Sequence, residues 1–204
     1  MGKRENGETE SEKTRLRRLL RDHRRSLSSG EVTKKSRLLF ERLLTCPPFQ
    51  QAENIVLYSA DENEVQTEAI WDEATRRHKA VYYPRISTDK ANLEFVRRVP
   101  GQPLVSGTFG ILIPPGDDLL TKVSATDVIL TPGVGFDLEG HRLGRGRGYY
   151  DRAFRGVLAG GLRIALAYES QLVDVIPTAA DDEPVHSIVT ETRFIDCTRE
   201  SQRA

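Results

Sequence analysis

Apolar positions along the chain alternate between a helical and an extended period, which predicts helices and strands in turn. From about residue 11 to residue 27, leucines recur at the offsets of one helical face. A second helix is expected to open at the capping box formed by Ser28 and Glu31 and to end at the proline pair 47–48. Thr67 is expected to cap a third helix that runs to about Arg77.

Short apolar runs between and after these helices predict strands. They cover residues 54–58, 80–83, 127–130, 163–168 and 187–190, and residues 93–96 alternate as in a half-exposed strand. The strand over 80–83 is expected to stop at Pro84, and a further helix is expected from about Tyr149 to Leu158. Strands separated by helices are joined by right-handed crossovers, so the sequence predicts an α/β fold, a three-layer α/β/α domain with a mainly parallel sheet.

The predicted sheet also indicates where a ligand would bind. In open α/β sheets, ligands bind at the carboxyl ends of the strands. The loops that follow Tyr58, Leu130 and Tyr168 are therefore the expected site. Residues 1–10 are polar and are expected to be a disordered tail, with residues 11–200 forming a single domain.

Composition excludes several classes of protein. The 204 residues hold 30 Lys plus Arg and 30 Asp plus Glu, and this zero net charge disfavours a dedicated nucleic-acid binder. No stretch approaches a membrane-spanning length of apolar residues, and the N-terminus has no apolar signal segment. The two cysteines, Cys46 and Cys197, lie far apart in sequence and suit a reducing compartment. We therefore expect a cytoplasmic protein that binds neither membranes nor nucleic acid.

The segment TPGVGFDLEGHRLGRGRGYYD, residues 131–151, carries the strongest chemical signal. Three glycines alternate with Arg145 and Arg147 between a predicted strand and a predicted helix. Glycines allow the backbone to approach a polyphosphate closely, and arginines grip its oxygens. The spacing is neither the dinucleotide fingerprint nor a Walker A loop. A flexible linker with solvated arginines is about equally common for so short a motif, but the flanking elements favour a phosphate site. We call residues 144–148 the Gly–Arg loop.

Asp151 lies in the first turn of the helix that follows this loop. An aspartate beside bound phosphates suits Mg²⁺, which takes one or two carboxylates together with phosphate oxygens. An acid that stabilises the helix N-terminus through the helix dipole is the alternative, and taken alone it is the more common case.

The run PGVGFDLEGHRLGRGRGYYD resembles the signature of the 5-formyltetrahydrofolate cyclo-ligase family, also called methenyltetrahydrofolate synthetases. The resemblance covers nearly the whole chain from Lys13. It includes the segments KTRLRRLLRDHRRSLS, LYSADENEVQTEAI, FGILIPP, ALAYESQLV and DDEPVHSIVTE. It implies ATP- and Mg²⁺-dependent conversion of 5-formyltetrahydrofolate to 5,10-methenyltetrahydrofolate, with release of ADP and phosphate. The implied route phosphorylates the formyl oxygen and closes the ring by attack of N10.

The resemblance also implies roles for individual residues. The catalytic residues would be Arg145, Lys13 and Tyr150. ATP would be bound by Lys13, Arg17, Arg142, Leu143, Gly144, Arg145, Gly146, Arg147, Gly148, Tyr149 and Tyr150. The folate would be bound by Arg17, Ser59, Glu64, Arg145, Gly146, Arg147, Gly148 and Tyr149. Mg²⁺ would be bound by Asp151 and Asp182.

Two positions depart from the family pattern, and one alternative function stays open. Many relatives carry histidine and aspartate where this chain has Asp181 and His186. A histidine there is either pH-sensitive near neutrality or a simple surface replacement. The alternative function is that of an inactive relative that binds a nucleotide, folate or RNA. The enzyme is favoured by the joint presence of Lys13, Arg17, Glu64, Arg145 and Asp151. We expect it to act as a monomer on ATP and a folate, and whether that folate is polyglutamylated is left open.

Overall fold

The computed structural model describes residues 2–198, with side chains from residue 9 onward. The main helices are α1 (Gly2–Arg25), α2 (Ser29–Leu44), α3 (Pro47–Gln51), α4 (Glu68–Arg76) and α5 (Tyr149–Arg155), with 3₁₀ turns η1 (Thr108–Gly110) and η2 (Glu169–Gln171). The strands of the central sheet are β1 (Asn54–Val56), β2 (Ala80–Ile86), β3 (Leu93–Arg97), β6 (Val128–Thr131), β9 (Leu162–Leu166), β10 (Ser187–Val189) and β11 (Phe194–Asp196). Two hairpins stand apart from it, β4 (Val105–Ser106) with β5 (Leu112–Ile113), and β7 (Gly135–Phe136) with β8 (Arg142–Leu143).

The central sheet has the order β11-β10-β9-β6-β1-β2-β3. The five strands from β10 to β2 are parallel to one another, and the edge strands β11 and β3 are antiparallel to their neighbours. The prediction of a mainly parallel α/β sheet is therefore confirmed. The sequence reasoning missed both hairpins, because strands of two residues leave too short a hydrophobic pattern to recognise. It also missed β11, which is largely exposed and lacks the buried apolar run of β1 and β10.

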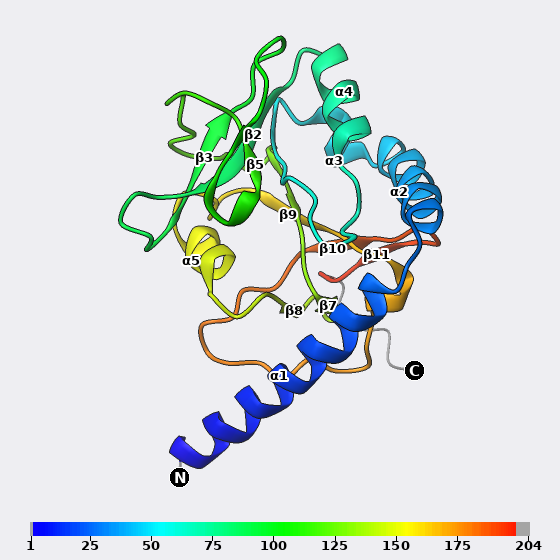
Figure 1. Ribbon diagram of the computed structural model, residues 1–204, viewed down its shortest axis with the longest axis vertical. Helices are drawn as coiled ribbons and strands as arrows, with labels where there is room; N and C mark the ends of the chain where they lie inside the picture. Colours follow the sequence, from blue (N-terminus) through cyan, green and yellow to red (C-terminus); the bar gives the residue numbers. More distant parts are fainter. Residues whose placement is uncertain (1, 199–204) are drawn as a thin grey trace.

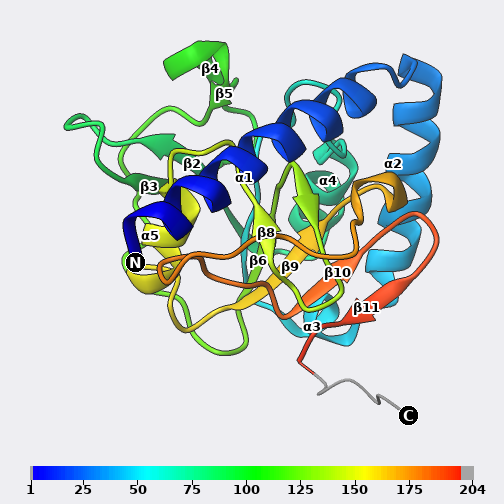
Figure 2. The same cartoon turned by 90° about the horizontal axis from the view of Figure 1, so that it is seen from below.

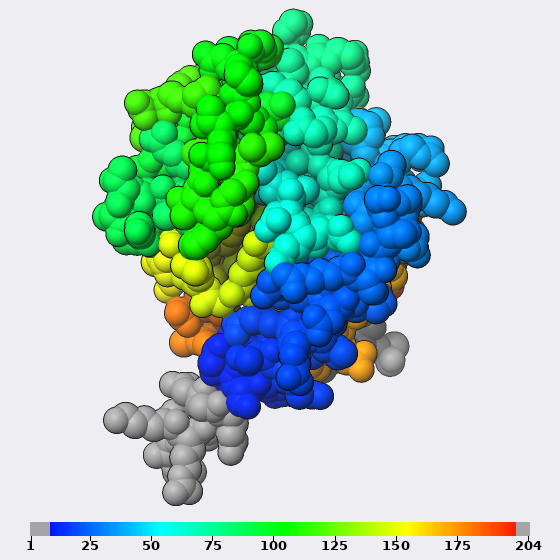
Figure 3. Space-filling model, viewed as in Figure 1, coloured from blue at the N-terminus to red at the C-terminus, as the bar shows by residue number. Residues whose placement is uncertain are grey.

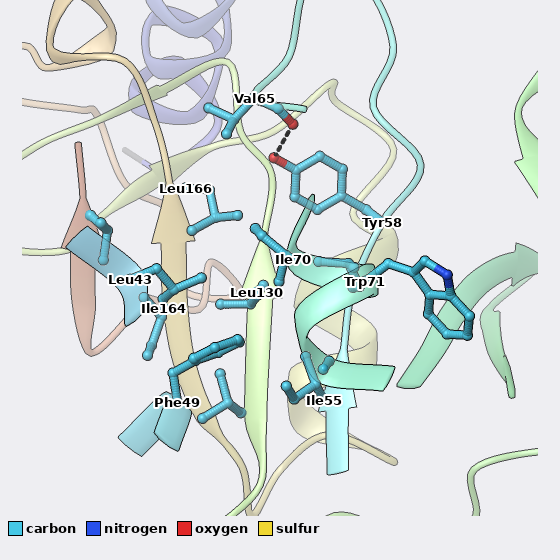
Figure 4. Close-up of a cluster of buried hydrophobic side chains, with 14 of the residues drawn as sticks. Leu43, Phe49, Ile55, Tyr58, Val65, Ile70, Trp71, Leu130, Ile164 and Leu166 are labelled. Carbon is cyan, nitrogen blue, oxygen red and sulfur yellow. Dashed lines mark hydrogen bonds between the residues drawn. The ribbon is translucent and has the colours of Figure 1, made fainter. Parts of the chain in front are cut away.

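Helices cover both faces of the sheet (Figure 1). Ile55 and Ile164 face a cluster that packs under α2, α3 and α4, whereas Val56 and Ile129 face α5. Figure 4 shows the first cluster, in which the Tyr58 hydroxyl donates a hydrogen bond of 3.1 Å to the Val65 carbonyl. Each fully buried aliphatic side chain contributes about 1.5–3 kcal/mol. Packing on both faces gives the expected three layers.

The first helix extends further than predicted. Residues 1–10 were expected to be disordered, but α1 begins at Gly2. The segment contains no proline and is rich in Lys, Arg and Glu, which are good helix formers. Glu10 also forms an ion pair of 2.7 Å with Arg17. Residue 1 lies outside the described residues, as do residues 199 and 200 of the expected domain.

The structure corrects one strand boundary and confirms one cap. β2 continues through Pro84 to Ile86, because β1 pairs with β2 only as far as Tyr82 and no neighbour on that side requires the missing N–H. The Ser28–Glu31 capping box of α2 is present as predicted. Within residues 2–198, no helix is both long enough and apolar enough to cross a membrane.

α1 lies across the loops that follow β1 and β6 (Figure 2). This arrangement brings residues near the N-terminus next to residues more than a hundred positions later in the chain. One such contact is the hydrogen bond of 3.1 Å from Arg17 Nε to the Gly144 carbonyl. The helix therefore closes one side of the region where the sheet topology predicts a ligand.

Candidate functional site

A pocket of about 630 Å³ opens at the carboxyl ends of β1 and β6. Its mouth lies where α1, the loop after β1, the β4–β5 hairpin and the Gly–Arg loop come together (Figure 3). Every site residue expected from the sequence lines this pocket: Lys13, Arg17, Ser59, Glu64, Arg142, Leu143, Gly144, Arg145, Gly146, Arg147, Gly148, Tyr149, Tyr150, Asp151 and Asp182. Residues from four separate segments of the chain thus share one cavity.

The Gly–Arg loop runs from β8 to α5 and depends on glycine at two positions. Gly146 has φ +91° and Gly148 has φ +62°, a region that side chains with a Cβ rarely adopt. A Cβ on Gly146 would also lie 3.4 Å from the Arg17 guanidinium. Because α5 has only seven residues, we expect the arginines rather than a helix dipole to supply most of the positive charge here.

One side of the pocket consists of paired charges, and we call it the polar wall: Lys13, Arg17, the Gly–Arg loop, Arg142, Asp151 and Asp182. Lys13 Nζ lies 2.5 Å from Asp182 Oδ2, and Arg142 Nη2 lies 2.8 Å from Asp151 Oδ1. The Glu183 amide lies 3.4 Å from Asp151 Oδ1, so the two aspartates belong to one region of the wall. The Lys13 side chain is only 7% exposed.

Arg145 joins the Gly–Arg loop to residues 59–66, which we call the acidic loop. Its guanidinium lies 2.9 Å from Asp61 and 3.0 Å from Glu64. Burial raises the pKa of the Glu64 carboxyl, although Arg145 and Arg24 act in the opposite direction. The sequence reasoning singled out Glu64 but not Asp61 or Arg24, because the family resemblance implies no role for either residue.

The two tyrosines after the loop differ in their surroundings. Burial raises the pKa of Tyr150, whose hydroxyl has no hydrogen-bond partner among the described residues. That hydroxyl is therefore a buried donor without a partner, which a ligand could satisfy only by direct contact. The Tyr149 hydroxyl donates to the Lys90 carbonyl at 3.1 Å, and Arg152 lies 5.1 Å from the centre of its ring. Tyr149 is thus held at the rim.

The opposite side of the pocket is apolar, and we call it the apolar wall. It consists of Pro84, Ile86, Leu93, Phe109, Ile111 and Ile113. The β4–β5 hairpin supplies the last three, and Ser59 ties it to the acidic loop by donating to the Leu112 carbonyl. The sequence reasoning noted FGILIPP only as a resemblance. A helical or alternating pattern does not identify apolar residues that face a ligand, so no signal singled them out.

The carboxylates of Asp151 and Asp182 could bind Mg²⁺ only together with further ligands. The described residues contain no group of three or more His, Cys, Asp or Glu placed to hold a metal ion. Mg²⁺ commonly takes one or two carboxylates and completes its shell with phosphate oxygens and water. Asp151 and Asp182 fit that pattern, provided that a nucleotide brings the remaining ligands.

His186 is not part of this site. Its Nδ1 accepts a hydrogen bond of 2.9 Å from the Arg163 amide. Burial lowers the pKa of His186, and Arg163 adds to the effect. The ring is therefore neutral near pH 7, which removes the pH-sensitive role left open above. Asp181, the other departure from the family pattern, does line the pocket.

Comparisons with known proteins agree with this geometry. The sequence model of the 5-formyltetrahydrofolate cyclo-ligase family matches residues 9–191, a span that includes every lining residue discussed above. The chain is 30% identical to the mouse 5-formyltetrahydrofolate cyclo-ligase over 191 residues, which are 89% of this chain and 94% of the mouse protein. It is also 30% identical to the enzyme of that name from Escherichia coli K12, over 86% of this chain and 98% of that one.

A solved structure extends the agreement to three dimensions. The NMR structure of the Aquifex aeolicus 5,10-methenyltetrahydrofolate synthetase is similar with a TM-score of 0.79 at 31% identity. The similarity covers 94% of this chain and 96% of that one. On these matches, the chain belongs to the 5-formyltetrahydrofolate cyclo-ligase family.

Proposed function

We propose that this protein converts 5-formyltetrahydrofolate to 5,10-methenyltetrahydrofolate, using ATP and Mg²⁺ and releasing ADP and phosphate. The observation that carries the proposal is the meeting, in one pocket, of Lys13, Glu64, the Gly–Arg loop and Asp151. These lie far apart in sequence, and each matches a family motif. Membership of the family supports the same conclusion.

The reaction begins with transfer of the γ-phosphoryl group. The formyl oxygen attacks the γ-phosphorus, the bond to ADP breaks, and ADP leaves. N10 then attacks the formyl carbon and loses its proton. The carbon–oxygen bond breaks, and phosphate leaves with the former formyl oxygen. No covalent bond to the protein is needed, so the protein must position the substrates and neutralise charge.

The polar wall provides the positive charge. Lys13 would contact the terminal phosphates in exchange for its ion pair with Asp182, and Arg145 and Arg147 would neutralise charge that develops on the transferring group. Asp182, once released, and Asp151 would hold Mg²⁺. When bound, the metal shields the negative charge of the phosphates. The Tyr150 hydroxyl can donate to an oxygen of the reacting group.

The other side of the pocket suits the folate. Glu64 can accept hydrogen bonds from the donors of the pterin ring. Phe109, Ile111 and Ile113 offer apolar surface for an aromatic ring system. The protein would act as a monomer in the cytoplasm, and these two properties stay predictions from the sequence.

A spectrophotometric assay tests the proposal. Purified protein is mixed with 5-formyltetrahydrofolate, ATP and Mg²⁺, and the near-ultraviolet absorbance of the methenyl product is followed. Omission of ATP and omission of the metal are the controls. We expect a signal that requires both. A flat trace from folded protein would favour the inactive relative, and binding of ATP, folate and RNA would then be measured separately.

A further inference from the structure

Arg24 is a buried cation that the reaction described above does not use. It lies near the end of α1, is 1% exposed and does not line the pocket. Its Nε donates to the Glu62 carbonyl at 3.0 Å, and its Nη1 donates to the Gly133 carbonyl at 3.2 Å. Burial of a guanidinium costs free energy unless the group is paired and hydrogen-bonded, because it must give up its hydration.

Arg24 reaches the acidic loop and the segment after β6 at once. Glu62 and Asn63 in the acidic loop have φ of +49° and +59°, a conformation that non-glycine residues rarely adopt without support. The bond from Arg24 to the Glu62 carbonyl supplies that support, as do the bonds from Asn63 Nδ2 to the carbonyls of Arg24 and Leu27. The end of α1 therefore fixes the conformation of the acidic loop, which carries Glu64.

Glu64 lies between two arginines that share one of its oxygens. Arg24 Nη1 is 3.6 Å from Glu64 Oε1, and Arg145 Nη2 is 3.0 Å from the same atom. The side chains differ in freedom, because Arg24 is 1% exposed and Arg145 is 38% exposed. Arg24 is fixed, whereas Arg145 can turn towards a ligand.

We propose that Arg24 is a positioning residue, which holds Glu64 in place and ionised when Arg145 turns to the phosphates of ATP. The inference rests on the proposed function, since it assigns Glu64 to the folate and Arg145 to the nucleotide. A single arginine could not both pair with Glu64 and bind the phosphates. The same Arg145 would have to serve both substrates, and Glu64 would lose its partner at the moment when the pterin must be held.

Burial works against the charge on Glu64. It raises the pKa of Glu64 and lowers the pKa of Arg24, whereas the opposite charge of each group favours the charged form of the other. The other ionisable groups that face or adjoin Glu64 are Asp61, Glu62, Tyr58, Tyr150 and Tyr168. The three tyrosines are neutral at physiological pH, since burial raises the pKa of each. Arg24 and Arg145 are therefore the cations on which the ionisation of Glu64 depends.

Kinetics of two variants and a matched control test the assignment. Arg24→Met removes the charge, Arg24→Lys retains it, and Arg25→Met removes a neighbouring exposed arginine that pairs with Glu62. We expect Arg24→Met to raise the folate KM by about 10- to 100-fold at neutral pH, as loss of a charged hydrogen-bond partner does. The increase should grow as the pH falls and shrink as the pH rises, with kcat affected less. Arg24→Lys should keep the pH profile of the unmodified protein, and Arg25→Met should change neither constant.

A measurement without substrate separates this inference from the proposed function. The carboxyl carbon of Glu64, labelled with carbon-13 and identified by its loss in Glu64→Gln, is titrated by NMR. In Arg145→Ala we expect Glu64 to remain ionised at pH 7, because Arg24 still faces it. In Arg24→Met its pKa should rise, and in Arg24→Lys it should not.

Either of two results would overturn the role of Arg24. One is a Glu64 that titrates near neutrality in Arg145→Ala, which would show that Arg24 does not keep it ionised. The other is an Arg24→Met protein with an unchanged pKa of Glu64 or with a folate KM that does not depend on pH. If Arg24→Met does not fold, the Arg145→Ala titration alone decides. An inactive but folded protein would refute the proposed function and leave the titrations interpretable.

Discussion

The two walls of the pocket are built on different principles. On the polar wall, Lys13 and Arg142 each form an ion pair with an aspartate. On the apolar wall, Phe109 is 67% exposed and has φ +61°, in a hairpin whose strands have two residues each. Its ring lies 4.7 Å from the Arg147 guanidinium. Ion pairs between segments far apart in sequence hold the polar wall together. The hairpin of the apolar wall is instead a short local structure.

This difference indicates that the two walls have different roles in binding. On the polar wall, the ion pairs with Asp182 and Asp151 hold Lys13 and Arg142 in defined positions, as a site that neutralises phosphate charge would require. The β4–β5 hairpin is short and partly exposed, so under the proposed function we expect it to adapt to a bound ring system. We therefore expect changes on the polar wall to affect turnover or ATP binding, and changes on the apolar wall to affect folate binding alone.

The largest effect is expected from Asp151→Asn. Asparagine keeps the size of the side chain and an acceptor for Arg142, but it lacks the charge proposed to hold Mg²⁺. We expect kcat to fall by about 10²–10³, the range seen when one charge-stabilising group is removed. The thermal unfolding midpoint should change little. Asp151→Ala is less informative, because it leaves the buried Arg142 unpaired, which lowers the free energy of unfolding by about 3–5 kcal/mol. Near-normal turnover of Asp151→Asn would remove this residue from the catalytic set.

A smaller effect, confined to the binding of ATP, is expected from Lys13→Met. Methionine preserves the buried stem of the side chain and removes the charge, so the KM for ATP should rise by about 10- to 100-fold. The KM for folate at saturating ATP should change much less. Lys34→Met, on the exposed side of α2, is the matched control. An unchanged ATP dependence would show that α1 has only a structural role at this position.

A still smaller effect is expected from Phe109→Ala on the apolar wall. Loss of an aromatic contact reduces the binding free energy by about 0.5–1.5 kcal/mol, which corresponds to a rise in the folate KM of about 2- to 10-fold. Because Phe109 is proposed only to contact the ring system, kcat should stay within about twofold. Phe194→Ala, exposed on β11 and outside the pocket, should change neither constant. A large fall in kcat would place the hairpin in the chemical step and contradict the division between the walls.

The smallest effect concerns stability at high pH. Burial raises the pKa of Tyr58 and of Tyr150, so the folded protein keeps both neutral where the unfolded chain ionises. Their contribution to stability is complete below the unfolded pKa of about 10 and declines as the pH rises above it. Ultraviolet titration should show these tyrosines ionising together with the loss of near-ultraviolet circular dichroism. Their ionisation in the intact protein near pH 10 would show that water reaches both hydroxyls and would contradict this prediction.

Much of the fold and of the polar wall could be predicted from sequence. The parallel strands are continuous buried runs, and the Ser28–Glu31 box is a local signal that does not depend on the rest of the fold. The residues that line the pocket could be named in advance because their segments resemble those of one family. Their meeting in one pocket follows from the topology, which places the loops after β1 and β6 at one edge of the sheet.

The remainder depends on contacts between distant segments. The apolar wall consists of ordinary hydrophobic residues whose exposure is decided by tertiary packing. Arg24 looks like one more arginine of a basic helix, and only the fold shows that it is buried against the acidic loop. The ion pairs of Lys13 and of Arg145 join residues more than eighty positions apart, and no local pattern specifies such partners. His186 likewise could not be assigned until its bond to Arg163 was known.

The most direct test of the account follows the formyl oxygen. 5-Formyltetrahydrofolate labelled with oxygen-18 at the formyl group is turned over with ATP and Mg²⁺, and the released phosphate is examined by mass spectrometry. If the formyl oxygen is phosphorylated and leaves with phosphate, one labelled oxygen per turnover appears in phosphate. Label found in water, with unlabelled phosphate, would contradict the proposed chemistry and the role assigned to the polar wall.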